Sequence, residues 1–564
     1  MNPLSLRWRT VPLLLLAAVL VLPVLAVLAS WLQWNADSAQ ILSEMASAVL
    51  PEYAITSLML CVAVGVGVAL VGGAAAAAVT LFEFPGRRVF EWALLLPLAM
   101  PAYVVAYAYT DFLQFSGPLQ TALRDTFGLR GRVFPEVRNV GGAAWVFIFS
   151  LYPYVYLLAR TALAERANHL METARLLGAP LSRRIREVAL PLARPALAAG
   201  VALALMETLA DFGVSSYFGI QTFTAGIYKA WLAMDNRIAA AQLATMLLAV
   251  VVGLLWQEQR TQRRMRFASA RGGRTGSAEA APVALQGAGR WAAWAVCGVP
   301  VLAGFVLPVV FMLRPLAADW SVLPWGRFVE WSFNSLRLGL GAAVLAVTAA
   351  LLLAWRTRQG GRQGADAVTR GVAQLASLGY AVPGAVVVVG LLLPVGWVQA
   401  ALPDAQLGYW ITATVLGVVW AYLVRFTAVA LQSVQSGYSR IPASLDDSAR
   451  MLGVTGIGLM TRVHWPLLKR SAAAAALLVF VDVMKELPAT LVLRPFDTDT
   501  LAVMTYQLAR DERLGEAALP ALALVLVGLI PVLMLSRAIS GSASSASSSA
   551  SPAATSPALT RSGA

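Results

Sequence analysis

Apolar and polar positions along this chain are grouped in long blocks and do not follow the short periods of strands or surface helices. Apolar runs of about 20 residues, the length needed to cross a bilayer as a helix, alternate with short charged segments. The pattern predicts an all-α integral membrane protein with about 12 transmembrane helices. The predicted spans are Val11–Leu32, Ile55–Leu81, Val89–Tyr109, Ala143–Leu158, Ala196–Tyr217, Ala239–Trp256, Trp291–Leu313, Ser335–Trp355, Val372–Leu393, Ile411–Leu431, Ala472–Val492 and Ala518–Leu535.

Composition agrees with a membrane protein and excludes a soluble globule. The 564 residues are 59% hydrophobic and 13% charged, whereas soluble domains carry about 25% charged residues. The net charge of +14 gathers in short inner loops such as the one that holds Arg358, where it orients spans and does not indicate nucleic-acid binding. Cys61 and Cys297 lie in apolar runs, so no disulfide framework is expected. His169 and His464 lack metal-ligand spacing, and no metal site is assigned.

One charged segment occurs twice. Ala174-Arg175-Leu176-Leu177-Gly178 matches Ala449-Arg450-Met451-Leu452-Gly453 at an offset of 275 residues, and each glycine precedes a proline, Pro191 or Pro466, by 13 positions. A repeat of this kind predicts two copies of one fold unit, here two parallel six-helix repeats. The expected units are a first repeat (1–256) with its segment at 170–195, a flexible linker (257–290), a second repeat (291–538) with its segment at 445–470, and a disordered tail (539–564).

The repeated segment has the pattern of a short helix lying across the inner membrane face. Gly178 permits a backbone turn that other residues make only at a cost, Ser182–Val188 can restart a helix, and Pro191 begins the next span. Such an element can receive force from a cytoplasmic partner and pass it to the spans. The alternative is a lipid-surface helix, which needs a basic face but no fixed interval between glycine and proline.

The segment resembles the signature of ABC importer permeases, E-A-A, three residues, G, nine residues, I-x-L-P. The first copy reads Glu172-Thr173-Ala174, Gly178 and Val188-Ala189-Leu190-Pro191, and the second reads Asp447-Ser448-Ala449, Gly453 and Val463-His464-Trp465-Pro466. The second copy departs from the pattern at Asp447, Ser448 and Trp465. The resemblance implies the type I permease fold and coupling to an ATPase through Glu172, Ala174, Gly178, Pro191, Asp447, Ala449, Gly453 and Pro466.

The same resemblance implies partners and a location. Two copies of an ABC ATPase subunit, a periplasmic substrate-binding protein and the lipid bilayer are expected, in the bacterial inner membrane with both termini cytoplasmic. The fused pair of repeats resembles ferric iron and thiamine permeases, and the stretches at 209–228 and 483–496 resemble the ferric group. The resemblance therefore implies ferric iron as the substrate, with a chelate, thiamine or a phosphonate as alternatives.

Ionisable residues in two spans form a further candidate site. Glu207 and Asp211 stand four residues apart, and Asp482 and Glu486 repeat that spacing 275 positions later beside Lys485. Charges in a membrane span are costly and mark either a pathway or internal pairing, and both interpretations remain open. A secondary transporter driven by protons through these carboxylates is the rival function. A membrane enzyme is disfavoured, because the sequence has no cluster of nucleophile and base. No phosphate-binding G-x-x-x-x-G-K-[ST] loop occurs, so no nucleotide cofactor is expected on this chain.

Overall fold

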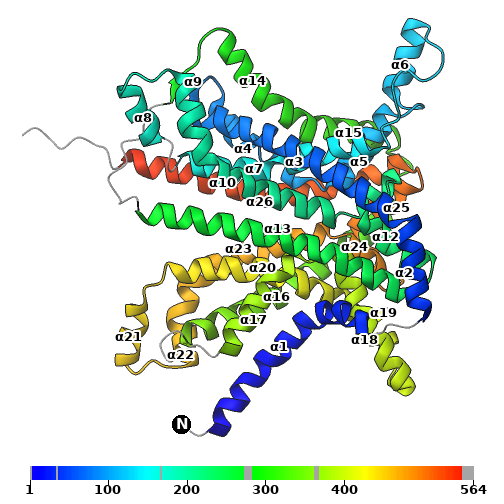
Figure 1. Cartoon of the computed structure of the whole chain (residues 1–564), viewed down its shortest axis with the longest axis vertical. Coiled ribbons are helices and arrows are strands. Elements are labelled where there is room, and N and C mark those ends of the chain that lie inside the picture. Colours follow the sequence, from blue (N-terminus) through cyan, green and yellow to red (C-terminus); the bar gives the residue numbers. More distant parts are fainter. Residues whose placement is uncertain (1–2, 33–35, 165–167, 272–281, 361–366, 549–564) are drawn as a thin grey trace, which may run out of the picture.

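The computed structural model of the chain describes residues 3–32, 36–164, 168–271, 282–360 and 367–548, which are almost entirely helical. The long helices run roughly side by side, and shorter ones cover the two ends (Figure 1). The first half contains α1 (Pro3–Ala29), η1 (Ser30–Leu32), α2 (Ala36–Ala48), α3 (Leu50–Leu81), β1 (Phe82–Glu83), α4 (Arg87–Ala93), η2 (Leu96–Ala99), α5 (Ala102–Leu113), α6 (Pro118–Phe127), α7 (Val140–Ala162), α8 (Asn168–Leu176), α9 (Leu181–Arg184), η4 (Ile185–Ala189), α10 (Leu190–Ala210), α11 (Gly213–Phe218), α12 (Phe223–Tyr228), η5 (Lys229–Ala233) and α13 (Arg237–Arg271).

The second half repeats this order of elements. It contains β2 (Val283–Ala284), α14 (Ala288–Val301), η6 (Leu302–Val306), α15 (Leu307–Ala318), α16 (Trp325–Gly360), α17 (Ala367–Leu378), η7 (Gly379–Ala381), α18 (Gly384–Ala401), η8 (Pro403–Ala405), α19 (Leu407–Thr412), α20 (Leu416–Ser439), α21 (Ala443–Met451), α22 (Ile457–Leu459), η9 (Met460–His464), α23 (Trp465–Lys485), α24 (Pro488–Leu493), α25 (Leu501–Arg510) and α26 (Leu514–Ser548). Helices α10 and α23 begin and end at positions that differ by 275, as do α11 and α24.

The predicted all-α membrane fold is confirmed. In the described residues, ten helices are long and apolar enough to cross a membrane, and an eleventh span is bent by 90° between Arg87–Ala99 and Ala102–Phe127. Helix α23 is the remaining predicted span. It carries two basic residues near its start and Asp482 and Lys485 near its end, which lowers its hydropathy, but its counterpart α10 lies in an apolar segment that passes the same test. The twelve predicted spans are thus all represented.

Several spans that were predicted as continuous are interrupted. In Val89–Tyr109, α4, η2 and α5 follow one another with a break at Pro101, and in Val372–Leu393 the break between η7 and α18 falls at Pro383. Both prolines have the same extended backbone, with ψ of 142°. Proline lacks the N–H that would continue the helix, and the residue before it disfavours helical angles. Such interruptions are tolerated where protein or water covers the freed backbone.

The two halves exchange their first spans. Helix α1 packs against α17 and α18 of the second half, and η6 and α15 pack against η2 and α5 of the first. The approach is close: a Cβ on Gly390 would lie 2.0 Å from the Pro23 carbonyl oxygen, and one on Gly304 would lie 2.3 Å from that of Phe149. The Trp420 indole N–H also donates to the Val19 carbonyl (2.6 Å). The first span of each half therefore packs against the other half as well as against its own.

The linker and the tail contain more helix than predicted. Helix α13 continues through the polar residues after Trp256 to Arg271, and α26 continues to Ser548. These runs are rich in Ala, Arg and Gln or in Ala and Ser, and no proline interrupts them, so a helix of this composition can extend beyond the bilayer. β2 forms a parallel pair with β1, Phe82 opposite Val283. Residues 272–281 and 549–564 of the predicted linker and tail lie outside the described part.

The two repeated segments lie at the same end of the helical bundle. In Figure 1, α8 and α9 of the first segment and α21 and α22 of the second project from this end, while α2, α6 and α19 lie at the opposite end. The start of α1 and the end of α26 are on the side of the repeated segments. This arrangement is the one that parallel repeats with an even number of spans require.

Candidate functional site

Each repeated segment turns at its glycine through the same backbone motif. Gly178 has φ of 79° and Gly453 has φ of 80°, in the left-handed region that glycine adopts without strain. In the first segment, the Gly178 N–H donates to the Arg175 carbonyl (2.9 Å) and the Ala179 N–H donates to the Ala174 carbonyl (3.0 Å). The second segment makes the equivalent bonds at 3.0 and 2.9 Å. This pair of bonds is the Schellman cap that ends a helix at glycine, and it explains the fixed Ala–Gly spacing.

The proline of each segment follows a π-turn. Residues 185–189 and 460–464 form these turns, and Pro191 and Pro466 then occupy the second positions of α10 and α23. A proline cannot donate the hydrogen bond that an α-helix needs there. The preceding residue instead bonds five positions back, Leu190 to Ile185 and Trp465 to Met460. The interval of 13 residues therefore places the π-turn and the start of the span at the same distance from the glycine in both segments.

Exposed apolar side chains mark the free ends of both segments. Leu176 and Leu177 are 81% and 82% exposed, and the residues 275 positions later, Met451 and Leu452, are 89% and 83% exposed. Glu172 lies within 3.8 Å of Arg175, and Asp447 lies at the same distance from Arg450. Both segments therefore present an apolar pair beside a charged pair, on the same end of the molecule. Exposed apolar groups that recur in this way are typical of a protein-binding surface.

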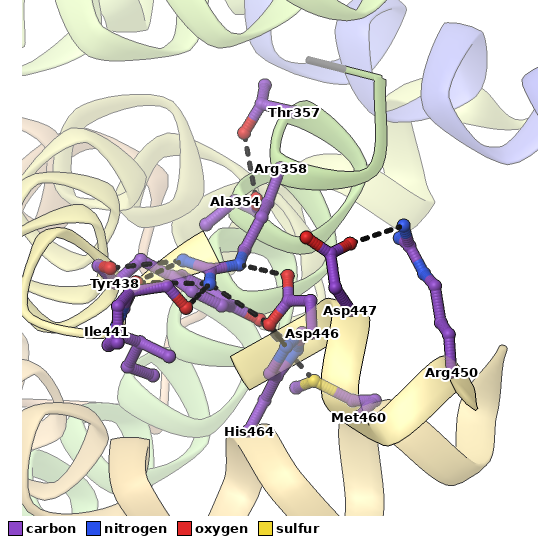
Figure 2. A network of polar contacts seen from close by, with 11 residues as sticks. Ala354, Thr357, Arg358, Tyr438, Ile441, Asp446, Asp447, Arg450, Met460 and His464 are labelled. Carbon is purple, nitrogen blue, oxygen red and sulfur yellow. Dashed lines mark hydrogen bonds and ion pairs between the residues drawn. The ribbon is translucent and has the colours of Figure 1, made fainter. Parts of the chain in front are cut away.

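The second segment is anchored by a buried polar network, which Figure 2 shows. The Arg358 guanidinium, from the end of α16, donates to both carboxylate oxygens of Asp446, at 2.8 and 3.0 Å. It also donates to the carbonyls of Tyr438, Ile441 and Pro442, at 3.1–3.3 Å. One side chain thus joins α16 to the turn between α20 and α21. Bidentate contact between arginine and a carboxylate fixes orientation as well as distance.

His464 extends the network to the π-turn. Its Nε2 lies 3.1 Å from Asp446 Oδ1, and its Nδ1 lies 3.3 Å from the Tyr438 hydroxyl. The histidine ring is 1% exposed and meets the Tyr438 ring edge to face. Burial is the largest influence on the pKa of Asp446 and raises it. The hydrogen bonds and charges of Arg358 and His464 outweigh burial, so the pKa of Asp446 lies below its usual value.

The first segment has apolar residues at the equivalent positions. Met171, Ala189 and Leu163 precede Asp446, His464 and Tyr438 by 275 positions, and all three are buried. Positions 80–83, which correspond to Arg358, hold no basic residue. At these positions the first segment therefore has hydrophobic packing where the second has an ion pair and hydrogen bonds.

Two of the four predicted carboxylates act as helix caps. Asp211 Oδ1 accepts from the Val214 N–H at 2.7 Å, and Glu486 Oε1 accepts from the Ala489 N–H at 2.9 Å. Each therefore caps the short helix, α11 or α24, that follows the interrupted span. Glu486 is also paired with Arg425 (2.9 Å), a residue that the sequence did not single out. In the first half the position equivalent to Arg425 holds Ser150.

All four carboxylates meet at one cavity between the two halves. The cavity, of about 180 Å³, is lined by Glu207, Asp211, Asp482 and Glu486 together with Arg425 and Lys485. The Lys485 Nζ donates to the Leu98 carbonyl of the other half at 2.9 Å. The sequence pairs Glu207–Asp211 and Asp482–Glu486 are thus brought together in space. No three His, Cys, Asp or Glu side chains in the described residues converge closely enough to hold a bare metal ion.

The chain consists of two helical repeats in a membrane protein, and each repeat has a segment that turns at a glycine at the same end of the bundle. This architecture is typical of a transporter subunit. The comparison with known families agrees. Residues 69–267 match the family model described as binding-protein-dependent transport system inner membrane component. Over these residues, which lie in the first half, the chain is similar to the membrane permease components of ABC importers.

Relatives of the chain transport several substrates. It is 24% identical to "Fe(3+)-transport system permease protein FbpB 2" of Haemophilus influenzae over 491 residues, 85% of this chain and 88% of the relative. It is 25% identical to "Putative 2-aminoethylphosphonate transport system permease protein PhnU" of Salmonella choleraesuis, over 33% of this chain and 67% of the relative. It is 30% identical to "Sulfate transport system permease protein CysT" of Salmonella typhimurium, over 24% and 46%.

Proposed function

We propose that this permease imports ferric iron, delivered by an external binding protein and driven by a separate ATPase. The similarity to the ferric permease extends along 85% of the chain and includes both repeats, whereas the phosphonate and sulfate permeases match 33% and 24%. The fused arrangement of two repeats resembles ferric iron and thiamine permeases alike, and the stretches at 209–228 and 483–496 favour iron between these two. The polar cavity between the halves is lined by oxygen-bearing side chains, which suit a hard cation.

The repeated segments are the proposed coupling segments, one for each copy of the ATPase subunit. The observation that carries this proposal is the pair of exposed apolar side chains in each segment, Leu176 and Leu177 in the first and Met451 and Leu452 in the second. The Schellman cap and the π-turn hold each pair at a fixed angle to the span that follows. A movement of the partner is thereby passed to α10 and α23, and alternating access follows as the two halves rock against each other. This role belongs to Glu172, Ala174, Gly178, Pro191, Asp447, Ala449, Gly453 and Pro466.

The proposed orientation places the coupling segments and both termini in the cytoplasm. It is supported by the shared end of the bundle in Figure 1 and by the basic residues after Trp256 and Trp355, because cytoplasmic loops are rich in Lys and Arg. The binding protein would then dock at the opposite end, where α2, α6 and α19 lie. The proposed sequence units are the two repeats 1–256 and 291–538, with the linker and tail between and after them.

The experiment is uptake by proteoliposomes that contain the full chain, its ATPase subunits and its binding protein. We expect ATP-dependent uptake of iron and none of thiamine or 2-aminoethylphosphonate. Leu177→Asp together with Leu452→Asp should abolish uptake and copurification of the ATPase, because burying a leucine contributes about 1.5–3 kcal/mol, which is at least tenfold in affinity at each segment. Leu402→Asp, an exposed leucine between α18 and α19, is the matched control and should retain both.

The outcomes separate the substrate from the coupling mechanism. Uptake of thiamine or the phosphonate in place of iron would overturn the substrate and leave the permease class intact. Full ATPase copurification and uptake by the double aspartate variant would overturn docking at these segments. Uptake without any ATPase subunit would favour a secondary transporter.

A further inference from the structure

The cavity between the halves has an uneven distribution of charge. Both of its basic side chains, Arg425 and Lys485, come from the second half, and the equivalent positions in the first half hold Ser150 and Ala210. Four carboxyl groups therefore face two basic groups. Arg425 is already paired with Glu486. Lys485, which lies in the same helix as Asp482, is the other basic group of the cavity. An acidic excess inside a membrane is costly unless a cation or bound protons compensate it.

Two of the carboxylates have no capping role. Glu207 and Asp482 occupy equivalent positions in α10 and α23, four residues before the capping residues, and both are partly accessible in the cavity. Neither carboxylate belongs to the ion pair between Arg425 and Glu486. Glu207 instead interacts with the Tyr380 hydroxyl, and Asp482 interacts with Lys485.

Buried hydroxyl groups without partners line the same cavity. The Tyr103 hydroxyl and the Ser150 hydroxyl accept and donate no hydrogen bond to any described residue, although these residues are only 6% and 3% exposed. Both line the cavity. A buried hydroxyl without a partner is destabilising, so the cavity is suited to polar contents. This observation is independent of the carboxylates and also indicates a ligand that oxygen atoms bind.

We propose that the cavity is a transit site for a hard, multiply charged cation, with Lys485 as a tethered counter-ion when the cation is absent. The proposal rests on the proposed import of ferric iron and assigns its position inside the membrane. Glu207 and Asp482 would supply the charge, and Tyr103 and Ser150 would bind the water shell. The cation keeps part of that shell, because the carboxylates do not converge on one point and the cavity has room for several waters at about 30 Å³ each.

Lys485 connects occupancy of the site to the contact between the halves. Without a cation, its ammonium group supplies positive charge to the cavity and donates to the Leu98 carbonyl across the boundary. A trivalent cation that enters the cavity repels the ammonium, because like charges a few ångströms apart interact strongly where water is scarce. Displacement of Lys485 breaks the bond to Leu98 and releases one contact that holds the halves together.

The test is binding of Tb³⁺, a hard trivalent probe whose luminescence is sensitised by nearby tyrosine, to the purified full chain. We expect saturable sensitised luminescence. Glu207→Gln with Asp482→Asn removes attraction to the cation and should weaken Tb³⁺ binding at least tenfold. Lys485→Met removes repulsion of the cation and should strengthen Tb³⁺ binding by about tenfold. Tyr103→Phe removes only a hydroxyl and keeps the packing, so it should preserve thermal stability and still lower the affinity. Glu330→Gln with Asp497→Asn, which changes carboxylates outside the cavity, is the matched control.

Each result supports or overturns the site. The site is overturned if the wild-type chain binds no Tb³⁺. It is also overturned if Tb³⁺ binding is unchanged both in the double carboxylate variant and in Tyr103→Phe. Two variants are used so that poor folding of one leaves the other informative. Iron uptake at the wild-type rate by a folded Glu207→Gln, Asp482→Asn chain would reject the transit site and leave the proposed function standing. A wild-type chain that imports no iron, but binds Tb³⁺ in the cavity, would reject the proposed function alone.

Discussion

The two proposed coupling segments share a backbone but differ in what holds them to the membrane spans. Both turn at a left-handed glycine, continue through a five-residue π-turn and enter a span at a proline. The second is fixed by Arg358, Asp446 and His464, and the first by Met171 and Ala189. The backbone motif is therefore the same in both segments, whereas the side chains that anchor the two segments differ.

This difference has a mechanical consequence. A bidentate ion pair has a preferred direction and holds α16, α21 and η9 in one arrangement, whereas apolar side chains can slide while they remain in contact. We expect the second segment to move as one body with α16 and α23. The first should tolerate more relative motion against α3 and α7. Replacing the buried ion pair with apolar residues need not reduce stability, so the two anchors can be tested separately for stability and for coupling.

The largest expected effect comes from removing one partner of the ion pair. Arg358→Met leaves the Asp446 carboxylate and the carbonyls of the 438–442 turn without their donor inside the protein. Removing one partner of a buried pair costs about 3–5 kcal/mol. We expect a lower thermal unfolding temperature of the full chain in detergent and loss of ATP-driven uptake.

The control for this prediction is Arg440→Met, an exposed arginine on the same turn. It should leave both the unfolding temperature and uptake near the wild-type values. An Arg358→Met chain as stable and as active as that control would show that the network in Figure 2 does not anchor the segment.

A smaller effect is expected when the second anchor is made apolar like the first. Arg358→Met, Asp446→Met and His464→Leu together remove every charged member of the network while keeping similar volume. Because no buried charge is left alone, stability should return to within about 1–2 kcal/mol of wild type. Thermal unfolding measures this recovery, and the ratio of ATP hydrolysed to iron imported measures coupling. A triple variant less stable than Arg358→Met would contradict the equivalence of the two anchors.

The sequence predicted the architecture better than it predicted these contacts. Block hydropathy gave twelve spans and the offset of 275 gave the repeat, because both are properties of the chain alone. The packing of α1 on the second half could not be predicted, since hydropathy does not specify which helices are neighbours. The interruptions at Pro101 and Pro383 could not be predicted from hydropathy either, because they depend on neighbours that cover the freed backbone.

The candidate sites show the same limit. Gly178, Gly453, Pro191 and Pro466 were found because their spacing repeats. Arg358 was assigned to an inner loop, and it reaches Asp446 only because α16 extends to Gly360. A comparison of the two copies could have located this contact. Asp446 and His464 are polar where Met171 and Ala189 are apolar. This difference indicates a buried polar contact in the second half alone.

The smallest expected effect is the pH dependence of the second anchor. Arg358 and His464 hold the pKa of Asp446 below its usual value, so its ionised form stabilises the folded chain. That stabilisation is complete above the unfolded pKa of about 3.9 and is lost as the pH falls through the lower folded pKa. The difference in unfolding temperature between wild type and Asp446→Asn should therefore be constant from pH 8 to about 5 and narrow below about pH 4. Asp125→Asn, an exposed carboxylate outside the network, provides the comparison. A difference that stayed constant down to pH 3 would mean that the charge of Asp446 contributes nothing, and that shape alone holds the second segment as it holds the first.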